Sequence, residues 1–267
     1  MPSIKNIDIN WRCLVRVLGA ISLSVSVSSG AHAQDNGAPV FPYRPSVSSP
    51  ALLPLAGQLE FELGWLRLKQ DDVRRDSVPF LFKLALNKEW GVLFGGEAGV
   101  ANRIDHTGTH RGVGDLNLVL KRAFLIDDAS AFGIELGSKI ATAKTSIGSG
   151  KNDLVLNGIY SRDLDSVHMD LNVNLMHLGS VETGSASMQK AWSASFSRPI
   201  NDKWGITGEV SGTQRKGAAS TAQTLLALTY SPHSRLTIDI GVVKGLNKGA
   251  PDYALLSGFV IPVAKLF

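Results

Sequence analysis

From Gly57 to the end of the chain, apolar and polar residues alternate with a period close to two. The clearest case is 167–175, where Val167, Met169, Leu171, Val173 and Leu175 alternate with His168, Asp170, Asn172 and Asn174. Residues 78–86, 153–160 and 235–242 repeat the pattern. Successive side chains of a β-strand point to opposite faces, whereas a helix needs apolar residues about 3.6 positions apart. The pattern therefore predicts strands that each have one apolar face.

The alternating segments number twelve, and each is about 10–15 residues long. A tilted membrane strand needs about 9–11 residues, and strands of soluble proteins most often have about 5–6. The lengths predict an all-β fold, an antiparallel transmembrane β-barrel of about 12 strands over residues 57–267. The predicted strands span residues 57–68, 77–87, 90–101, 113–125, 131–142, 152–161, 166–178, 187–197, 203–213, 220–230, 235–245 and 253–267.

The connections between these strands alternate between short and long. Outer-membrane barrels have short periplasmic turns and longer external loops, so the alternation predicts which end faces which compartment. An even number of strands then places both ends of the barrel in the periplasm. The short connections are 87–89, 127–128, 162–165, 198–202 and 231–234, and the long ones are 69–76, 102–112, 143–151, 179–186, 214–219 and 246–252.

Aromatic residues of the apolar parity gather at the short-turn end of the predicted strands. A lipid bilayer accounts for this grouping, because aromatic rings favour the headgroup level. At the other end Trp65 is the clearest member of a thinner girdle. The residues at the short-turn end are Trp90, Phe124, Phe132, Tyr160, Phe196, Trp204, Tyr230 and Phe267.

Charged residues within the strands have the opposite parity and are predicted to face the lumen. A Lys or Arg on the lipid face at the midplane costs about 2–4 kcal/mol, which decides this orientation. Two interpretations stay open: the charges line a pore, or they pair across the lumen and fill it. The acids outnumber the bases, which would favour cations in an open path. The acids are Glu60, Glu62, Glu97, Asp115, Glu135, Asp153, Asp170, Glu209 and Asp239, and the bases are Lys83, Lys121, Lys139 and Arg235.

The first 33 residues have the features of a secretory signal peptide. Lys5, Arg12 and Arg16 precede or flank an apolar stretch, 17–27, that is shorter than the roughly 20 residues of a spanning helix. Ala31-His32-Ala33 predicts cleavage after Ala33. The chain's one cysteine, Cys13, lies in this segment. Cleavage removes three of 27 basic and one of 23 acidic residues, which leaves a net charge of +2 and no basic stripe for nucleic acid.

Residues 34–56 are rich in Pro and Ser, with prolines at 39, 42, 45, 50 and 54. Proline removes a backbone donor and is excluded from helix interiors and central strands. The segment is predicted to be an extended periplasmic leader. We expect a free tail here rather than a segment inside the lumen.

Few residues have the arrangement of a catalytic or metal site. Asp105 and His106, with His110 nearby, could activate water, but a loop histidine is usually solvated. His168 and Asp170 are predicted to belong to the polar lumen. Gly148-Ser149-Gly150-Lys151 lacks the Ser or Thr and the helix of a phosphate loop, so a turn accounts for it. We therefore expect no catalytic residue, no metal site and no cofactor.

Several short motifs, in order over residues 40–267, resemble the meta-pathway of phenol degradation family of outer-membrane transporters. They are Arg44-Pro45-Ser46, Gly57-Gln58-Leu59-Glu60, Gly112-Val113-Gly114-Asp115, Leu120-Lys121-Arg122, and Gly148-Ser149-Gly150 with Asp153. Lys139-Ile140-Ala141-Thr142 and Lys265 depart from the usual pattern. The resemblance implies a barrel tied to the breakdown of aromatic compounds and uptake of hydrophobic small molecules. It assigns no binding residue.

The sequence thus predicts an outer-membrane barrel that passes or binds a small, aromatic or hydrophobic molecule. A structural barrel with a filled lumen is the alternative, and a barrel hydrolase that uses His106 and His110 is a third hypothesis. The expected partners are outer-membrane lipid and the barrel-assembly machinery, which would read the terminal Phe267.

Overall fold

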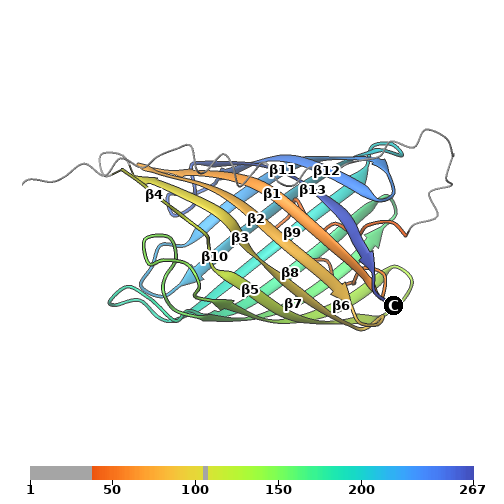
Figure 1. The fold of residues 1–267 in the computed structure, drawn as a ribbon, viewed down its shortest axis with the longest axis horizontal. Helices are drawn as coiled ribbons and strands as arrows, with labels where there is room; N and C mark the ends of the chain where they lie inside the picture. Colours follow the sequence, from red (N-terminus) through yellow and green to blue (C-terminus); the bar gives the residue numbers. More distant parts are fainter. Residues whose placement is uncertain (1–37, 105–107) are drawn as a thin grey trace, which may run out of the picture. The chain divides into compact units, whose positions relative to one another are not determined.

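The computed structural model describes residues 38–104 and 108–267 (Figure 1). The predicted signal peptide and the cleavage site after Ala33 lie outside these residues. The described chain forms one antiparallel sheet that closes on itself, because β1 pairs with both β2 and β13. Its strands are β1 (Gln58–Gln70), β2 (Val73–Ala85), β3 (Trp90–Ile104), β4 (Gly108–Gly112), β5 (Leu116–Leu125), β6 (Ser130–Ile140), β7 (Asp153–Leu164), β8 (Val167–His177), β9 (Met188–Pro199), β10 (Trp204–Arg215), β11 (Thr221–His233), β12 (Leu236–Gly245) and β13 (Tyr253–Lys265).

The wall has twelve strand positions, as the sequence predicts. Strands β4 and β5 both pair with β3, the first with residues 100–104 and the second with residues 90–96. They share one position in the wall and are separated by residues 113–115. Among the described residues no helix is long and apolar enough to cross a bilayer.

Two of the predicted external loops are wrong. Residues 69–76 form the tip of a hairpin, because β1 and β2 continue to Gln70 and Val73 around a two-residue turn in which Asp71 has a φ of 47°. Residues 102–112 largely extend β3 and form β4. Charged side chains pair across this hairpin, with Arg67 Nε 2.6 Å from Asp76 Oδ1. A strand that extends beyond the bilayer no longer needs an apolar face.

The short turns are closed by side chains that accept hydrogen bonds from the backbone. Asn87 Oδ1 accepts from the N–H groups of Glu89 and Trp90, both at 2.8 Å, and Asn201 Oδ1 does the same for Lys203 and Trp204 at 3.0 Å. Each of these Asx turns thereby fixes a tryptophan at the start of a strand. In the turn 126–129, a hydrogen bond from the Ser130 hydroxyl lowers the pKa of Asp127.

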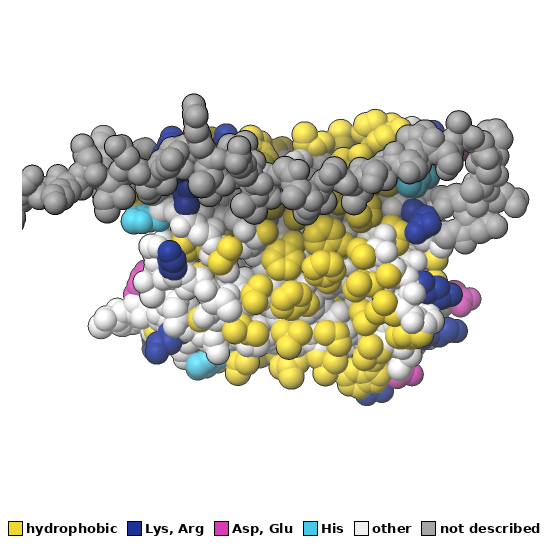
Figure 2. Space-filling model, viewed as in Figure 1, with side chains coloured by type: hydrophobic (Ala, Val, Ile, Leu, Met, Phe, Trp, Pro, Cys, Tyr) yellow, Lys and Arg dark blue, Asp and Glu magenta, His cyan; other side chains and the backbone are white. Residues whose placement is uncertain are grey.

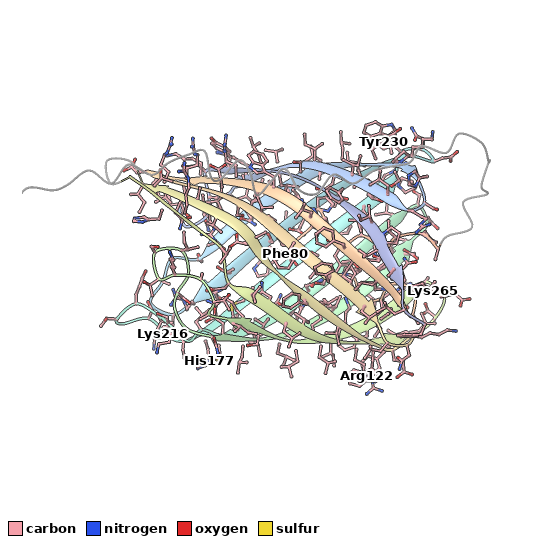
Figure 3. The ribbon with its side chains drawn as sticks, in the orientation of Figure 1. Phe80, Arg122, His177, Lys216, Tyr230 and Lys265 are labelled. Carbon is pink, nitrogen blue, oxygen red and sulfur yellow. The ribbon has the colours of Figure 1, made fainter. Side chains whose placement is uncertain are left out.

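The outer face of the wall is apolar across its middle. Figure 2 shows hydrophobic side chains in a broad band on the visible face, with Lys and Arg side chains toward both ends. In Figure 3, Phe80 lies within the band, Arg122 and Lys265 lie toward the short-turn end, and His177 and Lys216 lie toward the other end. Leu226, Ile240 and Val242 are exposed, whereas their neighbours Leu225, Ala227 and Val243 are buried inside. The predicted parity is therefore confirmed.

Several of the predicted girdle aromatics meet across neighbouring strands. The rings of Trp204 and Tyr230 lie 4.7 Å apart, and those of Phe124 and Phe132 lie 6.2 Å apart. The guanidinium of Arg122 lies 5.1 Å from the centroid of the Trp90 ring. Such pairs at the strand ends provide the amphipathic rim that a membrane interface favours.

The two ends of the barrel meet at Gly57. Its carbonyl accepts from Leu266 N–H at 2.7 Å, and its own N–H donates to Ala85 O at 2.9 Å. Gly57 has a φ of +78°, and a Cβ there would stand 2.2 Å from Phe267 O. Only glycine fits this junction, from which the chain turns from the preceding segment into β1.

Candidate functional site in the barrel lumen

The described part of the leader, residues 38–56, lies inside the barrel. It begins at the short-turn end, where Val40 N–H donates to Ser234 O at 2.9 Å. It returns to that end, where Ala56 bridges to Ala85 just before β1 (Figure 1). Between these points Tyr43, Ser48 and Ala51 are buried. The expectation of a free periplasmic tail is therefore wrong for residues 38–56.

The first limb of the leader binds two glutamates of β1. Phe41 N–H donates to Glu60 Oε1 at 3.0 Å, and Tyr43 N–H donates to Glu62 Oε1 at 2.8 Å. Lys83 of β2 lies 3.0 Å from Glu60 Oε2 and 2.6 Å from Glu62 Oε1, and it donates to Phe41 O. Glu60 and Lys83 are completely buried. One lysine and two backbone amides thus balance two carboxylates in a closed site.

The ring of Tyr43 lies between two buried lysines. Lys83 Nζ is 4.5 Å and Lys121 Nζ is 4.4 Å from its centroid. An aromatic face attracts cations, so the ring contributes to holding both ammonium groups out of water. The Tyr43 hydroxyl donates to Leu52 O at 3.1 Å, which ties the first limb of the leader to the second.

Arg44 reaches from the leader to the last two strands of the wall, which adjoin β1. Its Nε donates to Asp239 Oδ2 at 3.0 Å, and its Nη2 donates to Asp239 Oδ1 at 3.1 Å and to Ser257 O at 3.0 Å. Gly64 of β1 and Gly258 of β13 are cross-strand partners under the guanidinium. A Cβ on either residue would come within 2.5 Å of an Arg44 nitrogen. This glycine pair provides the slot that the arginine occupies.

The apex of the leader, residues 46–48, is bound to Glu209 of β10. Glu209 Oε2 accepts from Val47 N–H, Ser48 N–H and Ser48 Oγ, each at 3.0 Å, and from Ser46 Oγ. Ser48 Oγ also lies 2.8 Å from Ser193 Oγ, which can donate to it. Glu209 is only 4% exposed, and within the described residues its carboxylate has no cationic partner. Four neutral donors balance a buried charge, as in an anion-binding nest.

The second limb returns along β5 to β8. Ser49 N–H donates to Asn172 Oδ1 at 3.0 Å, and Ala51 N–H donates to Ser161 Oγ at 2.7 Å. Lys121 donates to Pro50 O and lies 3.0 Å from Glu135 Oε1. Asp170 accepts a hydrogen bond from Ser161 Oγ and lies 3.1 Å from His168 Nε2. His168 and Asp170 are thus part of the polar lumen, as the sequence predicts.

These contacts change the interpretation of the acidic excess. Glu60, Glu62, Glu209 and Asp239 bind backbone amides, hydroxyls or the guanidinium of the leader. The excess of acidic over basic residues on the luminal face could have revealed that another segment binds there, because buried carboxylates need hydrogen-bond donors. The basic residues predicted to face the lumen are too few to supply these donors. One of them, Arg235, lies in an exposed turn, so its predicted luminal position is wrong.

The long-loop half of the lumen has a charged sector on β2 to β7. Arg75 pairs with Glu97, and Lys139 lies 2.8 Å from Asp153 Oδ2 and 3.7 Å from Asp115 Oδ2. Asp115 accepts from Thr142 N–H and Ala143 N–H at 3.1 and 2.9 Å, which fixes the start of the loop 141–152. Residues 147–149 of this loop and the charged pairs enclose a polar cavity of about 280 Å³.

An apolar sector occupies the facing part of the same half. Two of its residues lie on β1 beyond Gly64, and the others lie on β11, β12 and β13. The sector is therefore away from the short-turn end. In the order of strands around the wall, this sector lies opposite β5 to β7. Its inward side chains are Leu66, Leu68, Leu225, Ala227, Val243, Ala254 and Leu256.

A cavity of about 310 Å³ lies between the leader and the wall of β2, β3 and β5. Leu81, Leu93 and Val119 form its apolar side. Residues 43, 44 and 46–49 form another side, where Val47 at the apex is 64% exposed. A separate pocket of about 450 Å³ opens at the short-turn end beside His168, Ser197 and Thr207. Residues 46–49 at the apex of the leader thus line the cavity, and Thr207, two positions before Glu209 on β10, lines the short-turn pocket.

Of the catalytic candidates Asp105, His106 and His110, the structure describes only His110. Asp105 and His106 lie outside the described residues, and His110 is an exposed residue of β4. Gly148-Ser149-Gly150-Lys151 lies in the loop between β6 and β7, and Lys139 Nζ is 2.6 Å from Ser149 Oγ. Within residues 38–104 and 108–267, no three His, Cys, Asp or Glu side chains form a group that could hold a metal ion.

No protein-family model matches the chain, and no curated protein matches it. Solved barrels match its fold. The NanC porin has a TM-score of 0.54 and 10% identity, covering 77% of this chain and 100% of that one. The KdgM porin has a TM-score of 0.50 and 10% identity (76% and 99% covered), and the β domain of the Bordetella autotransporter BrkA has 0.50 and 12% (78% and 100% covered).

At these identities the likeness concerns the fold, which porins and an autotransporter share. The fold and the apolar outer band define the class: the chain is a twelve-stranded β-barrel of the outer-membrane type.

Proposed function

We propose that this protein is an outer-membrane channel for small molecules that have an apolar body and a polar substituent. The observation that carries the proposal is the two-sided lumen of the long-loop half. An apolar sector on β11, β12, β13 and β1 faces the β5 to β7 part of the charged sector, and a cavity of about 310 Å³ lies between the wall and the leader. Apolar walls with a few placed polar groups favour amphipathic solutes.

The resemblance to the phenol-degradation transporters supports the same substrate class, namely a small aromatic compound with a hydroxyl or carboxyl group. The apolar outer band supports insertion into the outer membrane, and the Ala31-His32-Ala33 motif supports cleavage behind Ala33. Luminal residues at which a solute would first be held are Asp115, Lys139 and Asp153, with Glu97 beside them.

Planar-bilayer recording with the purified protein tests the proposal. We expect discrete conductance steps that a phenolic solute reduces more strongly than a polyol of similar size. Val243→Thr adds a hydroxyl to the apolar lumen and should weaken the block by the phenolic solute severalfold. Val242→Thr makes the same change on the lipid face and should not. A protein with neither conductance nor solute flux in liposomes is not a channel.

A structural barrel without transport is the second candidate. The observation that favours it is the leader, which fills the short-turn half of the lumen and pairs with its charges. This candidate predicts that no solute passes whether the leader is bound or displaced. The hydrolase hypothesis rests on His106 and His110, and an ester or peptide hydrolysis that survives their double replacement by Ala would refute it.

A further inference from the structure

We propose that the short-turn half of the lumen is a binding site for an extended peptide, that residues 40–51 of the chain are its reversible occupant, and that solutes pass when this occupant leaves Glu209. The inference rests on the proposed channel function only in its last part. The binding site itself stands on the hydrogen bonds of the leader.

The leader binds as a peptide ligand binds in a groove. Its own backbone N–H groups at Phe41, Tyr43, Val47, Ser48 and Ala51 donate to side chains of the wall, and two of its carbonyls accept from Lys83 and Lys121. Main-chain recognition of this kind holds an extended segment without making it part of the sheet. Except for the Ala56–Ala85 bridge at its base, the leader pairs with no strand.

The leader can leave without breaking the barrel. The ladder between β1 and β13 begins at Gln58 and continues to Lys69 with one register shift between Leu59 and Glu60, and the chain turns at Gly57. Most of the leader's bonds are polar, and water can replace such partners once it fills the lumen, so each bond adds only modest net stability. The apolar contribution at the apex is small, because Val47 is exposed to the cavity.

Glu209 is the residue that holds the plug, residues 40–51 of the leader, in its bound position. It holds the apex through four donors; the apex residues 46–48 line the cavity, and Thr207, two positions before Glu209 on β10, lines the short-turn pocket. Arg44 and Lys83 have charged partners on neighbouring strands, but the carboxylate of Glu209 relies on the neutral donors of the leader. Its release therefore separates residues 46–48 from the wall and joins the two spaces.

Thiol labelling of the full chain tests whether the plug is reversible. In a Cys13→Ser background each variant has a single thiol. Ser48→Cys places it at a buried position and Val47→Cys at the neighbouring exposed one. With a small water-soluble thiol reagent we expect Val47→Cys to react at once and Ser48→Cys to react completely but roughly a hundredfold more slowly. Adding Glu209→Gln should speed the Ser48→Cys reaction roughly tenfold and leave Val47→Cys unchanged.

Two results would overturn the proposal. Equal rates for the two cysteines would mean that the leader does not occupy the site. A Ser48→Cys thiol that stays unreactive even with Glu209→Gln would mean that the plug is permanent.

A cysteine pair tests the link to passage. Ser48 Oγ and Ser193 Oγ are 2.8 Å apart, so Ser48→Cys with Ser193→Cys places two sulfurs within reach of a disulfide. Ser231 Oγ and Thr237 Oγ1 are 2.9 Å apart on β11 and β12, and Ser231→Cys with Thr237→Cys is the matched pair that joins two wall strands without the leader. We expect oxidation to abolish conductance in the first pair, reductant to restore it, and the second pair to conduct in both states.

The outcomes separate the two ideas. Equal conductance of the oxidised and reduced leader pair would refute the plug as a gate, while the channel would stand. Slow labelling that Glu209→Gln accelerates, in a protein that never conducts, would refute the channel and leave the reversible peptide site standing. A heat-dependent shift in gel mobility confirms that each variant is a folded barrel before it is used.

Discussion

Arg44 and Asp239 are 195 positions apart in the sequence, and two nitrogens of the guanidinium donate to the two carboxylate oxygens at 3.0 and 3.1 Å. Asp239 is 1% and Arg44 is 16% exposed in their side chains. This ion pair joins the leader to β12 in a site that largely excludes water. Its loss would leave a buried carboxylate with fewer donors than it needs.

Arg44→Met should detach the leader from the wall. Removing one partner of a buried ion pair costs up to about 3–5 kcal/mol of stability. The part of this cost that destabilises the bound state of the leader favours its release. We expect a lower unfolding temperature and labelling of Ser48→Cys at least tenfold faster. Arg67→Met removes one partner of the more exposed pair with Asp76, so it should change stability by less than about 1 kcal/mol. Equal effects of the two variants would contradict this account.

Gly64→Ala should displace the guanidinium while keeping both charges. The new Cβ would stand 2.4 Å from an Arg44 nitrogen, so the side chain has to leave its slot over the Gly64–Gly258 pair. A cost of about 1–3 kcal/mol is typical of such overpacking. Gly208→Ala is the control, because its Cβ would meet nothing within 4 Å. Urea unfolding in detergent micelles measures both, and a Gly64→Ala protein as stable as the parent would rule out a tight slot.

Lys83→Met should destabilise the barrel more than either single change at Glu60 or Glu62. The lysine lies between both carboxylates, and its removal leaves two buried acids close together. Adding Glu62→Gln to Lys83→Met should recover a part of the lost stability, because one of the two charges is then absent. A double variant less stable than Lys83→Met would show that the amide cannot replace the carboxylate toward Tyr43 N–H.

Ion selectivity should depend on the state of the leader. With the leader bound, its donors occupy Glu60, Glu62, Glu209 and Asp239, and once it leaves these carboxylates face the lumen. We therefore expect a cation preference in the open state, as the acidic excess predicts, and a smaller one in a Glu209→Gln variant. The reversal potential in a potassium chloride gradient measures it. Anion preference in the parent protein would contradict the prediction.

Phe267→Ser should impair assembly in the cell but not stability in detergent. The ring is 64% exposed, and the junction with Gly57 uses the backbone carbonyl of Phe267. A surface change of this kind shifts stability by no more than about 0.5 kcal/mol. Leu266→Ser, at a neighbour that is 54% exposed, is the control for lost apolar surface. The fraction of heat-shifting protein in outer membranes, compared with refolding in detergent, separates the two effects, and equal cellular levels would remove Phe267 as an assembly signal.

The strands of the wall could be predicted from the sequence because the bilayer imposes a two-residue alternation of apolar and polar side chains. Lipid outside and polar groups inside force alternation, so Leu226 and Ile240 could be placed outside and Glu209 and Asp239 inside. The hairpin tip at Asp71 could not be placed, because the outer ends of β1 and β2 lie beyond the apolar band and their charges pair across strands. There the alternation ends while the strand continues.

The leader could not be placed, because its bonds are made by backbone amides that leave no trace in side-chain pattern. Phe41 and Tyr43 bind Glu60 and Glu62 through main-chain N–H groups, which any residue except proline offers. What the sequence does contain is the other half of the contact: acids in the strands with too few bases to match. The position of the apex depends on the curvature of the closed sheet.

The contact of Arg44 with Asp239 and Ser257, above the paired Gly64 and Gly258, has a mechanical consequence. The barrel closes at the ladder between the first and last strands, which no turn of the chain connects. The arginine binds the last two strands from inside the barrel and lies over the first strand, so it links the strands on both sides of the closure. Arg44 can make these contacts only after β1 and β13 have paired. The leader would therefore be the last part of the chain to fold into place.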